Sequence, residues 1–343
     1  MKQPEGDQRW EKTGSQTIKE SMGMTANIHK TTEVDRLAVT VVTDNYYDSL
    51  RPDTAISTTY RSKPGSVIHA EHGLSYHVET VADGVAASLF FDFGMDPMGM
   101  AHNTDVLGID IGKISVLALS HGHFDHWGGL AGFLKQHGSH IPKGIPLYVG
   151  PEAFARRFSL RPSDEKPQDI GALDRTDLEK LGIVEIIETK EAREIVPGGY
   201  LTGPIPRVTE YEKDNPNLLV MKEDRLVRDS FEGERAMVFA VKGRGLVILS
   251  GCAHVGIVNI IKHALAMTGI SKVHAIIGGF HLVNTRKDLI DRSIEDIGGF
   301  APDYIVPTHC TGFETVMRFA REMPEQFVLN TAGTRYSFGV GER

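Results

Sequence analysis

Residues 120–126 read Ser-His-Gly-His-Phe-Asp-His, which gathers three histidines and one aspartate into seven positions. An apolar run of strand length, residues 114–119, comes directly before them. Trp127-Gly-Gly-Leu130 follows and has the character of a helix entry. Burying this many ionisable groups in one turn does not stabilise a purely structural protein, because each buried group costs free energy unless it is paired or bound to a metal. The stretch therefore predicts a metal site at the end of a strand.

The spacing within this stretch sorts its side chains into two groups. Residues two apart on extended backbone point the same way, so His121 and His123 can converge on one ion. Asp125 and His126 lie where the chain turns into the helix and can face a second ion. Imidazole and carboxylate are the ligands that borderline and hard divalent cations prefer.

The stretch resembles the His-x-His-x-Asp-His signature of the metallo-β-lactamase-fold superfamily, and the likeness extends from about residue 37 to residue 338. Leu89–Gly94 is similar to the superfamily's strand-ending Asp-x-Gly segment. A narrower branch, the 7,8-dihydropterin-6-methyl-4-(β-ribofuranosyl)aminobenzene-5′-phosphate synthases, is resembled by four further segments: Glu71–Ser75, Ser250–His254, Gly278–Leu282 and Pro307–Gly312. The resemblance implies an α/β fold, a four-layer αββα sandwich of two mixed β-sheets flanked by helices.

Two later histidines complete the ligand set that the resemblance implies. His254 follows the strand-like run 246–250, and His309 follows the run 304–307. In this fold metal-binding loops lie at strand ends, so we assign His254 to the first ion and His309 to the second. Each alone is also compatible with a hydrogen-bonded core histidine.

The chain departs from the superfamily pattern at Gly251-Cys252, where most members carry a bridging aspartate. Cys252 can bind as a thiolate, which suits zinc, or can be an inert buried thiol. The cofactor is accordingly expected to be one or two divalent ions, zinc first, with manganese or iron as alternatives. No histidine lies between His140 and His254, which is the reason for placing His254 in the first group.

Several other side chains are candidates for supporting roles. By its likeness to phosphodiesterases of the superfamily, His281 is expected to act as a general acid or substrate contact, with Asp125 also orienting the nucleophile. Asp92 is expected to accept the far N–H of a ligand histidine. Three further candidates for second-shell or substrate contact are Asn45, His72 and Arg207. The alternative for His72 and the neighbouring Glu71, equally compatible with the sequence, is that both lie in an ordinary surface turn.

Composition narrows the class of protein. The chain has 343 residues, 41% hydrophobic and 24% charged, with a net charge of −8. That acidity argues against a nucleic-acid partner, because such binding needs a basic footprint. The absence of long apolar stretches argues against a membrane, and two cysteines fit a reducing compartment. We expect a cytoplasmic protein that acts on a small anionic substrate. The composition leaves open whether the protein forms a homo-oligomer.

The chain reads as a polar N-terminal arm, residues 1–34, and a single domain, residues 35–343, with a lid-like insertion around 203–233. Strands are expected at 37–42, 75–80, 86–91, 114–119, 146–149, 182–187, 200–203, 236–241, 246–250, 273–277 and 304–307, and near 327–330 and 336. Helices are expected at 105–112, 126–137, 151–159, 255–268, 287–297 and 315–323.

These features together predict a metal-dependent hydrolase that uses a metal-bound hydroxide on a small anionic substrate. A phosphate ester is favoured over a β-lactam as the substrate because of the family resemblance and because His281 resembles the proton donor of the superfamily's phosphodiesterases. The alternative within the branch is a synthase that condenses a pterin diphosphate with an aminobenzene riboside phosphate. A non-hydrolytic metal or redox protein is a third interpretation, and a nuclease is disfavoured by the net acidity.

Overall fold

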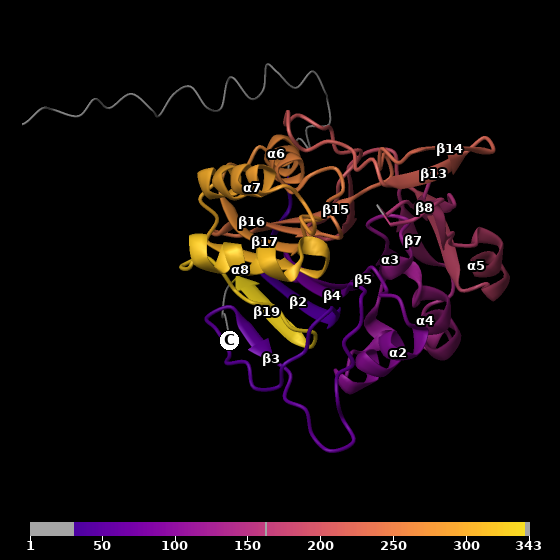
Figure 1. Ribbon diagram of the computed structural model, residues 1–343. Coiled ribbons are helices and arrows are strands. Elements are labelled where there is room, and N and C mark those ends of the chain that lie inside the picture. The colour runs from indigo at the N-terminus through magenta and orange to yellow at the C-terminus, as the bar shows by residue number, and fades with distance from the viewer. Residues whose placement is uncertain (1–30, 162, 340–343) are drawn as a thin grey trace, which may run out of the picture.

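The computed structural model describes residues 31–161 and 163–339, which build two large β-sheets and one small one (Figure 1). The first large sheet consists, in spatial order, of β11 (Arg193–Val196), β12 (Gly199–Leu201), β15 (Ala236–Val241), β16 (Gly245–Ser250), β17 (Val273–Gly279) and β18 (Tyr304–Thr308), and β1 (Glu33–Val34) pairs with β15. Strands β15, β16 and β17 are apolar on both faces, as strands covered on both sides must be.

The second large sheet consists, in spatial order, of β10 (Val184–Glu188), β7 (Ile145–Val149), β6 (Val116–Ala118), β5 (Val85–Phe91), β4 (Ser75–Ala82), β2 (Arg36–Thr43), β19 (Thr334–Gly339) and β3 (Ser57–Thr59). Both large sheets are mixed. In the first, β16, β17 and β18 run parallel while β15 is antiparallel to β16. In the second, β5, β6 and β7 run parallel while β2, β4 and β5 alternate in direction.

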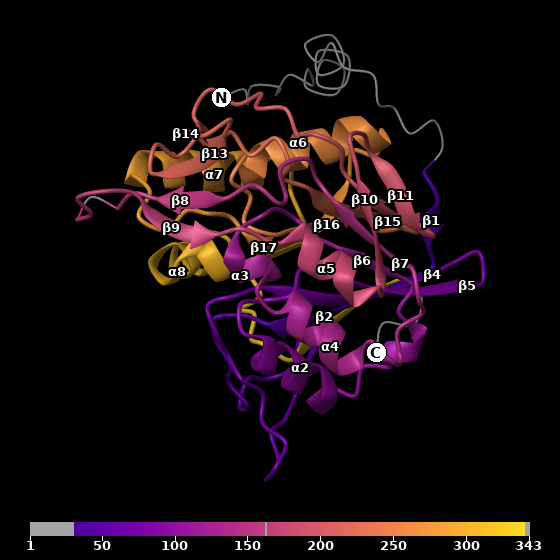
Figure 2. The same ribbon diagram turned by 90° about the vertical axis from the view of Figure 1, so that its right-hand side faces the viewer.

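A third, four-stranded sheet stands outside this pair. It consists of β14 (Arg225–Arg228), β13 (Leu218–Lys222), β8 (Arg157–Ser159) and β9 (Gln168–Gly171). Figures 1 and 2 both show it beside the short helix α3 (Phe124–Trp127). The segment expected as a lid-like insertion thus contains the β13–β14 hairpin.

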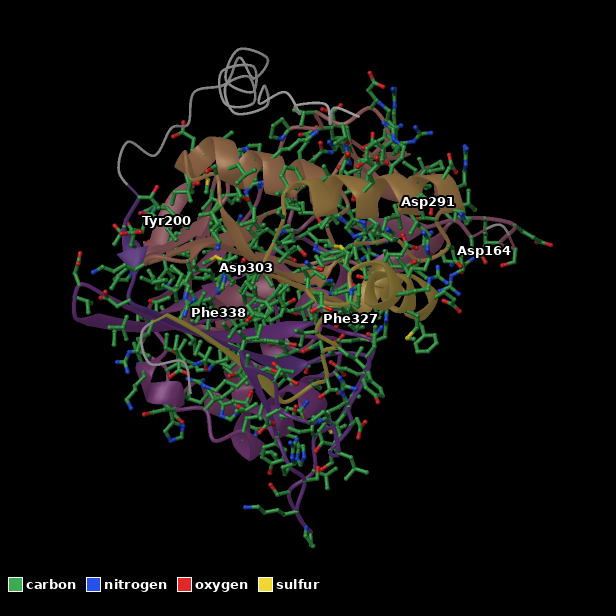
Figure 3. The ribbon with its side chains drawn as sticks, turned by 90° about the vertical axis from the view of Figure 1, so that its left-hand side faces the viewer. Asp164, Tyr200, Asp291, Asp303, Phe327 and Phe338 are labelled. Carbon is green, nitrogen blue, oxygen red and sulfur yellow. The ribbon has the colours of Figure 1, made fainter. Side chains whose placement is uncertain are left out.

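Helices cover the outer faces of the large sheets, and three apolar layers hold the fold together. On the first sheet lie α6 (Ile257–Thr268), α7 (Lys287–Gly299) and α8 (Phe313–Glu322), and on the second lie α2 (Pro97–Val106), α4 (Leu130–His137) and α5 (Arg175–Leu181). Between the sheets is a core to which Phe338 belongs (Figure 3). Two short 3-10 helices, η1 (Ile111–Lys113) and η2 (His309–Thr311), complete the set. The predicted four-layer αββα sandwich is confirmed.

Most elements expected from the sequence are present, with shifted ends. Four expectations are wrong. The helix expected at 126–137 is two helices, α3 and α4, because the carbonyls of Asp125 and His126 accept the backbone N–H groups of Leu74 (3.1 Å) and Phe93 (2.7 Å) instead of continuing the helix. The helix expected at 105–112 is instead α2, which begins at Pro97 where Asp96 accepts a bond from the Met98 N–H, followed by η1.

The helix expected at 151–159 does not exist either. Residues 151–155 form turns, and 157–159 are strand β8, which pairs with β13 from more than fifty residues further along the chain. Near 327–330 there is only an isolated bridge between Ile305 and Phe327, and no strand.

Most of the expected N-terminal arm lies outside the described residues; its last two positions, 33 and 34, form β1. Every helix in the described part of the chain is too short or too polar to cross a bilayer.

Candidate metal centre

The candidate site forms where the carboxyl ends of strands from both large sheets meet. Strands β5 and β6 are parallel neighbours, and so are β16, β17 and β18. Parallel neighbours end at the same edge of a sheet, so the loops that follow them converge. Those loops carry the predicted residues of the site: Asp92, His121, His123, Asp125, His126, Cys252, His254, His281 and His309.

Three of these histidines form the first cluster. Ligand atoms of His121, His123 and His254 all lie within 4.8 Å of one another, and all three residues are buried. Nε2 of His121, Nε2 of His123 and both ring nitrogens of His254 have no hydrogen-bond partner in the described structure. Burial lowers the pKa of each ring well below its ordinary value, so the rings are neutral and their lone pairs are free for a cation.

Asp125, His126, Cys252 and His309 form the second cluster, again with ligand atoms within 4.8 Å. Nε2 of His126 lies 3.0 Å from Sγ of Cys252, and Nε2 of His309 lies 3.2 Å from Oδ2 of Asp125. Burial alone would raise the pKa of Asp125, but His126 and His309 hold it well below its usual range. Burial raises the pKa of the Cys252 thiol, so this group needs a cation to lose its proton.

These two clusters fit divalent cations on the chemistry of their donors. A group of three imidazoles with unpaired nitrogens is a nitrogen donor set, and the second group adds a thiol and a carboxylate. Buried polar atoms normally have hydrogen-bond partners, so the four unpaired ring nitrogens of the first cluster need an explanation, and a cation supplies one.

Asp92 supports the histidine motif through hydrogen bonds to Ser120 and His126. It is fully buried, accepts bonds from the Ser120 backbone N–H (2.7 Å) and hydroxyl (2.6 Å), and lies 2.7 Å from Nδ1 of His126. The Ser120 hydroxyl oxygen is also 2.9 Å from Nδ1 of His121. Each contact uses Nδ1 and leaves Nε2 directed at the cluster, the arrangement in which an outer carboxylate fixes a ligand ring.

Replacing Asp92 by asparagine is expected to lower zinc affinity about 10–100-fold, because the His126 ring loses its anionic partner. Asparagine tolerates the positive φ of 64° at this position, so the backbone is kept. Competition with a chelating dye measures the affinity, and the exposed Asp288→Asn variant is the control. An unchanged affinity in the folded Asp92→Asn protein would show that Asp92 does not position the ring.

Asn45 and His72 both contact His309. Nδ1 of His309 lies 3.2 Å from Oδ1 of Asn45, and the Asn45 amide donates to the His309 carbonyl at 3.1 Å. The ring of His72 stacks on that of His309 with centroids 5.0 Å apart, and its Nε2 is 3.6 Å from Oδ2 of Asp125. The His72 side chain is 61% exposed and that of Asp125 17%, so solvent reaches the second cluster here.

His281 lies beside the first cluster, with its ring centroid 4.2 Å from that of His254. Burial lowers its pKa to about 4, so the free protein holds a neutral imidazole there at neutral pH.

Backbone strain concentrates in the loops that form the candidate site. Five of the eleven non-glycine residues with positive φ in the described part belong to the site or its wall: Asp92, Phe231, Ala253, His281 and His309.

Arg207 lies behind His254. Its guanidinium donates to the backbone oxygens of His254 (3.0 Å) and Ser230 (3.3 Å) and forms an ion pair with Asp214 at 2.6 Å. It is thus engaged by protein groups that shape the His254 loop. A cavity of about 330 Å³ adjoins this loop and is lined in part by Arg207, Phe231 and Val255. Neither this cavity nor a larger one of about 670 Å³ has a candidate metal ligand in its wall.

Sequence reasoning missed two residues that hold His254. Glu234, fully buried, accepts the backbone N–H groups of His254 (2.8 Å) and Val255 (2.7 Å), and burial raises its pKa to about 7. Phe231 stacks on the His254 ring at 3.9 Å. Both come from the stretch just before β15, where no local pattern distinguishes them from surface residues.

Arg157 is a third missed residue, and it supports the motif at 120–126. It is buried, pairs with Asp229 at 2.8 Å and donates to the Gly122 carbonyl at 3.3 Å. A side chain at position 122 would lie 2.2 Å from the Arg157 guanidinium, which explains the glycine between His121 and His123.

Comparison with known proteins gives consistent matches. The family model for the metallo-beta-lactamase superfamily matches residues 91–214. The 7,8-dihydropterin-6-methyl-4-(beta-D-ribofuranosyl)-aminobenzene-5′-phosphate synthase of Methanocaldococcus jannaschii is 32% identical over 272 residues, covering 78% of this chain and 90% of that protein. An uncharacterized protein of the same organism is 26% identical over 254 residues, 74% of this chain and 88% of its own.

Among solved structures, a metal-dependent hydrolase of the beta-lactamase superfamily superimposes with a TM-score of 0.67. It is 24% identical and covers 88% of this chain and 99% of its own. This likeness shows that the hydrolase and the present chain share a fold.

Proposed function

Because the chain belongs to the metallo-β-lactamase superfamily, as its motifs predict, we propose that it is a metal-dependent hydrolase of a small phosphate ester. One observation carries the proposal. Four imidazole nitrogens on His121, His123 and His254 are buried without partners, next to a second cluster that solvent can reach. Such an arrangement combines a place for cations with access for a substrate.

The first cluster would hold one divalent ion, and the second would hold another through Asp125, His126, Cys252 and His309. The thiol in the second group favours zinc over manganese. When bound, such ions lower the pKa of a water ligand toward neutrality and polarise an oxygen of the substrate.

The protein's own groups then have distinct tasks. Asp92 and Asn45 fix the rings of His126 and His309 through Nδ1. Asp125 is ionised at neutral pH and can accept a hydrogen bond from the attacking water, which orients it. His281 is neutral in the free protein and can donate its ring N–H to a substrate oxygen, and an adjacent phosphate charge raises its pKa toward that of a proton donor.

Replacing His281 by alanine is expected to lower turnover of a phosphate ester about 100-fold or more while zinc content stays unchanged. The reason is that His281 lies beside the first cluster without belonging to either group of convergent ligand atoms. Turnover and bound zinc are measured on the same preparation. Loss of zinc in the variant would make His281 a ligand and remove it from the proton-transfer role.

Turnover of bis-p-nitrophenyl phosphate tests the proposed activity. We expect zinc-loaded protein to release nitrophenolate, and a chelator to abolish the release until zinc is restored. Turnover that survives complete removal of metal would overturn the proposal, as would its absence with every phosphate ester at full zinc loading.

A second candidate function rests on the synthase from Methanocaldococcus jannaschii, which this chain matches over 90% of that protein's length. In that reaction class the cluster would stabilise a leaving diphosphate, and the nucleophile would be an aromatic substrate in place of water. Incubation with a pterin diphosphate and an aminobenzene riboside phosphate separates the two. Condensation without phosphate-ester turnover favours the synthase.

A further inference from the structure

Asp44 is a buried carboxylate with no part in the reaction proposed above. It is 2% exposed and comes directly after β2 of the second large sheet. Its side chain accepts a hydrogen bond from Thr308, the last residue of β18 in the first large sheet. Aspartate is almost never fully buried unless it is paired, so its partners show what it holds in place.

Three groups donate hydrogen bonds to the Asp44 carboxylate. Oδ1 accepts the backbone N–H of Asn45 at 2.8 Å. Oδ2 accepts the hydroxyl of Thr308 and, at 2.6 Å, the side-chain amide of Asn330. The Tyr336 hydroxyl donates to the oxygen of that amide at 2.9 Å, which turns the NH₂ group toward Asp44. Asp44 thus joins the ends of two sheets and the segment before β19.

Two of these partners lead directly to His309 in the second cluster. The Asn45 side chain contacts Nδ1 and the carbonyl of His309, and Thr308 precedes His309 in the chain. His309 has a φ of 50°, a strained conformation for a residue with a side chain, which persists only where the surroundings impose it. Asp44 therefore holds both the residue before this strained turn and the residue that contacts its ring.

The first cluster is held by different groups. Glu234 and Phe231 hold His254, and the Ser120 hydroxyl contacts His121. No hydrogen bond joins Asp44 to any of these residues in the part of the chain that the structure describes. The network around Asp44 thus reaches only one of the two clusters.

We propose that Asp44 is a positioning residue for the second cation alone, and that it decides whether the centre holds one ion or two. This inference rests on the proposed function for the presence of metal. Both carboxylate oxygens are occupied by protein donors, so Asp44 acts through Asn45 and Thr308 and not by binding the ion itself.

Replacing Asp44 by asparagine in two backgrounds tests the selectivity. Asparagine keeps the size of the side chain, but its NH₂ group faces a donor in either orientation, at Asn45 or at Asn330. A His123→Ala background leaves the second cluster as the complete one, and a His309→Ala background leaves the first. Zinc affinity of the full chain is measured in each by competition with a chelating dye.

In the His123→Ala background, we expect Asp44→Asn to lower zinc affinity about tenfold or more, the lower end of the range for partners that orient a ligand. In the His309→Ala background, the same change should leave zinc affinity within twofold. The exposed Asp288→Asn variant is the matched control and should change neither affinity.

Thr308→Val is the second variant, because it removes one donor and keeps the carboxylate. It should lower zinc affinity in the His123→Ala background by a smaller factor and leave the His309→Ala background unchanged. Near-UV circular dichroism shows whether each variant is folded, and Thr308→Val decides the question where Asp44→Asn is not.

An equal fall of zinc affinity in both backgrounds would reduce Asp44 to a general structural role and overturn the inference. An unchanged affinity in the His123→Ala background would also overturn it, as would a His123→Ala protein that binds no zinc. Turnover of a phosphate ester by the wild type is measured separately. Turnover without the selective effect keeps the hydrolase proposal and removes this inference, while the selective effect without turnover does the reverse.

Discussion

Replacing His123 by alanine is expected to abolish zinc binding at the first cluster and to lower phosphate-ester turnover about 1000-fold. Removing one of three imidazoles leaves two, and a catalytic zinc site keeps about three protein ligands. Metal assistance contributes several kcal/mol to the transition state, and about 4 kcal/mol corresponds to that factor. Bound zinc by mass spectrometry and turnover at saturating substrate measure the two effects.

The control for this variant is His140→Ala, which removes an exposed histidine after α4. It should retain full zinc content and activity. His123→Ala protein that binds zinc at wild-type stoichiometry and affinity would remove His123 from the ligand set. The unpaired nitrogens of the first cluster would then need another explanation.

Replacing Arg157 by methionine is expected to lower the free energy of unfolding by about 3–5 kcal/mol, because it leaves the Asp229 carboxylate buried without its partner. Methionine retains much of the side-chain volume, so the loss is mainly electrostatic. The change also removes the donor to the Gly122 carbonyl, so zinc affinity should fall with it. Chemical denaturation of the zinc-free protein isolates the stability effect.

The neighbouring residue gives a matched control. Arg156 forms an ion pair with Asp169 in which both side chains are about half exposed. Exposed pairs contribute about 0–1 kcal/mol, so Arg156→Met should change the free energy of unfolding by less than 1 kcal/mol. Equal destabilisation by the two variants would show that burial of the Arg157 pair is not what makes it important.

The sequence was sufficient for the layers of the fold because its strands have strong local signatures. The runs that became β2, β15, β16 and β17 are apolar and β-branched, and the amphipathic patterns of α6 and α7 are regular. Helices with weak apolar periodicity were missed or misplaced. The side chain of Asp96 and the proline after it mark the start of α2, but the helix shows little amphipathic pattern.

Two of the errors share one physical cause, which is contact with distant parts of the chain. Residues 157–159 became a strand because β13 pairs with them, and no local pattern announces a partner that far along the sequence. The helix expected at 126–137 was interrupted because carbonyls in its first turn bond to the backbone N–H groups of Leu74 and Phe93, which are remote in sequence. Local propensity is overridden wherever such tertiary contacts are tight.

The site divides in the same way. Its candidate metal ligands were recognisable, since they lie in the segments that follow strands, and the structure brings His121, His123 and His254 into one group and Asp125, His126, Cys252 and His309 into another. The groups that hold them were not recognisable. Glu234 and Arg157 act through backbone atoms of residues remote in sequence, and such contacts leave no motif.

Anomalous X-ray diffraction at the zinc absorption edge, on crystals of the zinc-loaded protein, tests the central claim most directly. The account predicts a peak about 2.0–2.1 Å from a ring nitrogen of each of His121, His123 and His254, the usual zinc–nitrogen distance. A second peak is expected among Asp125, His126, Cys252 and His309. A map without a peak between the three histidines, from crystals that contain zinc elsewhere, would contradict the account.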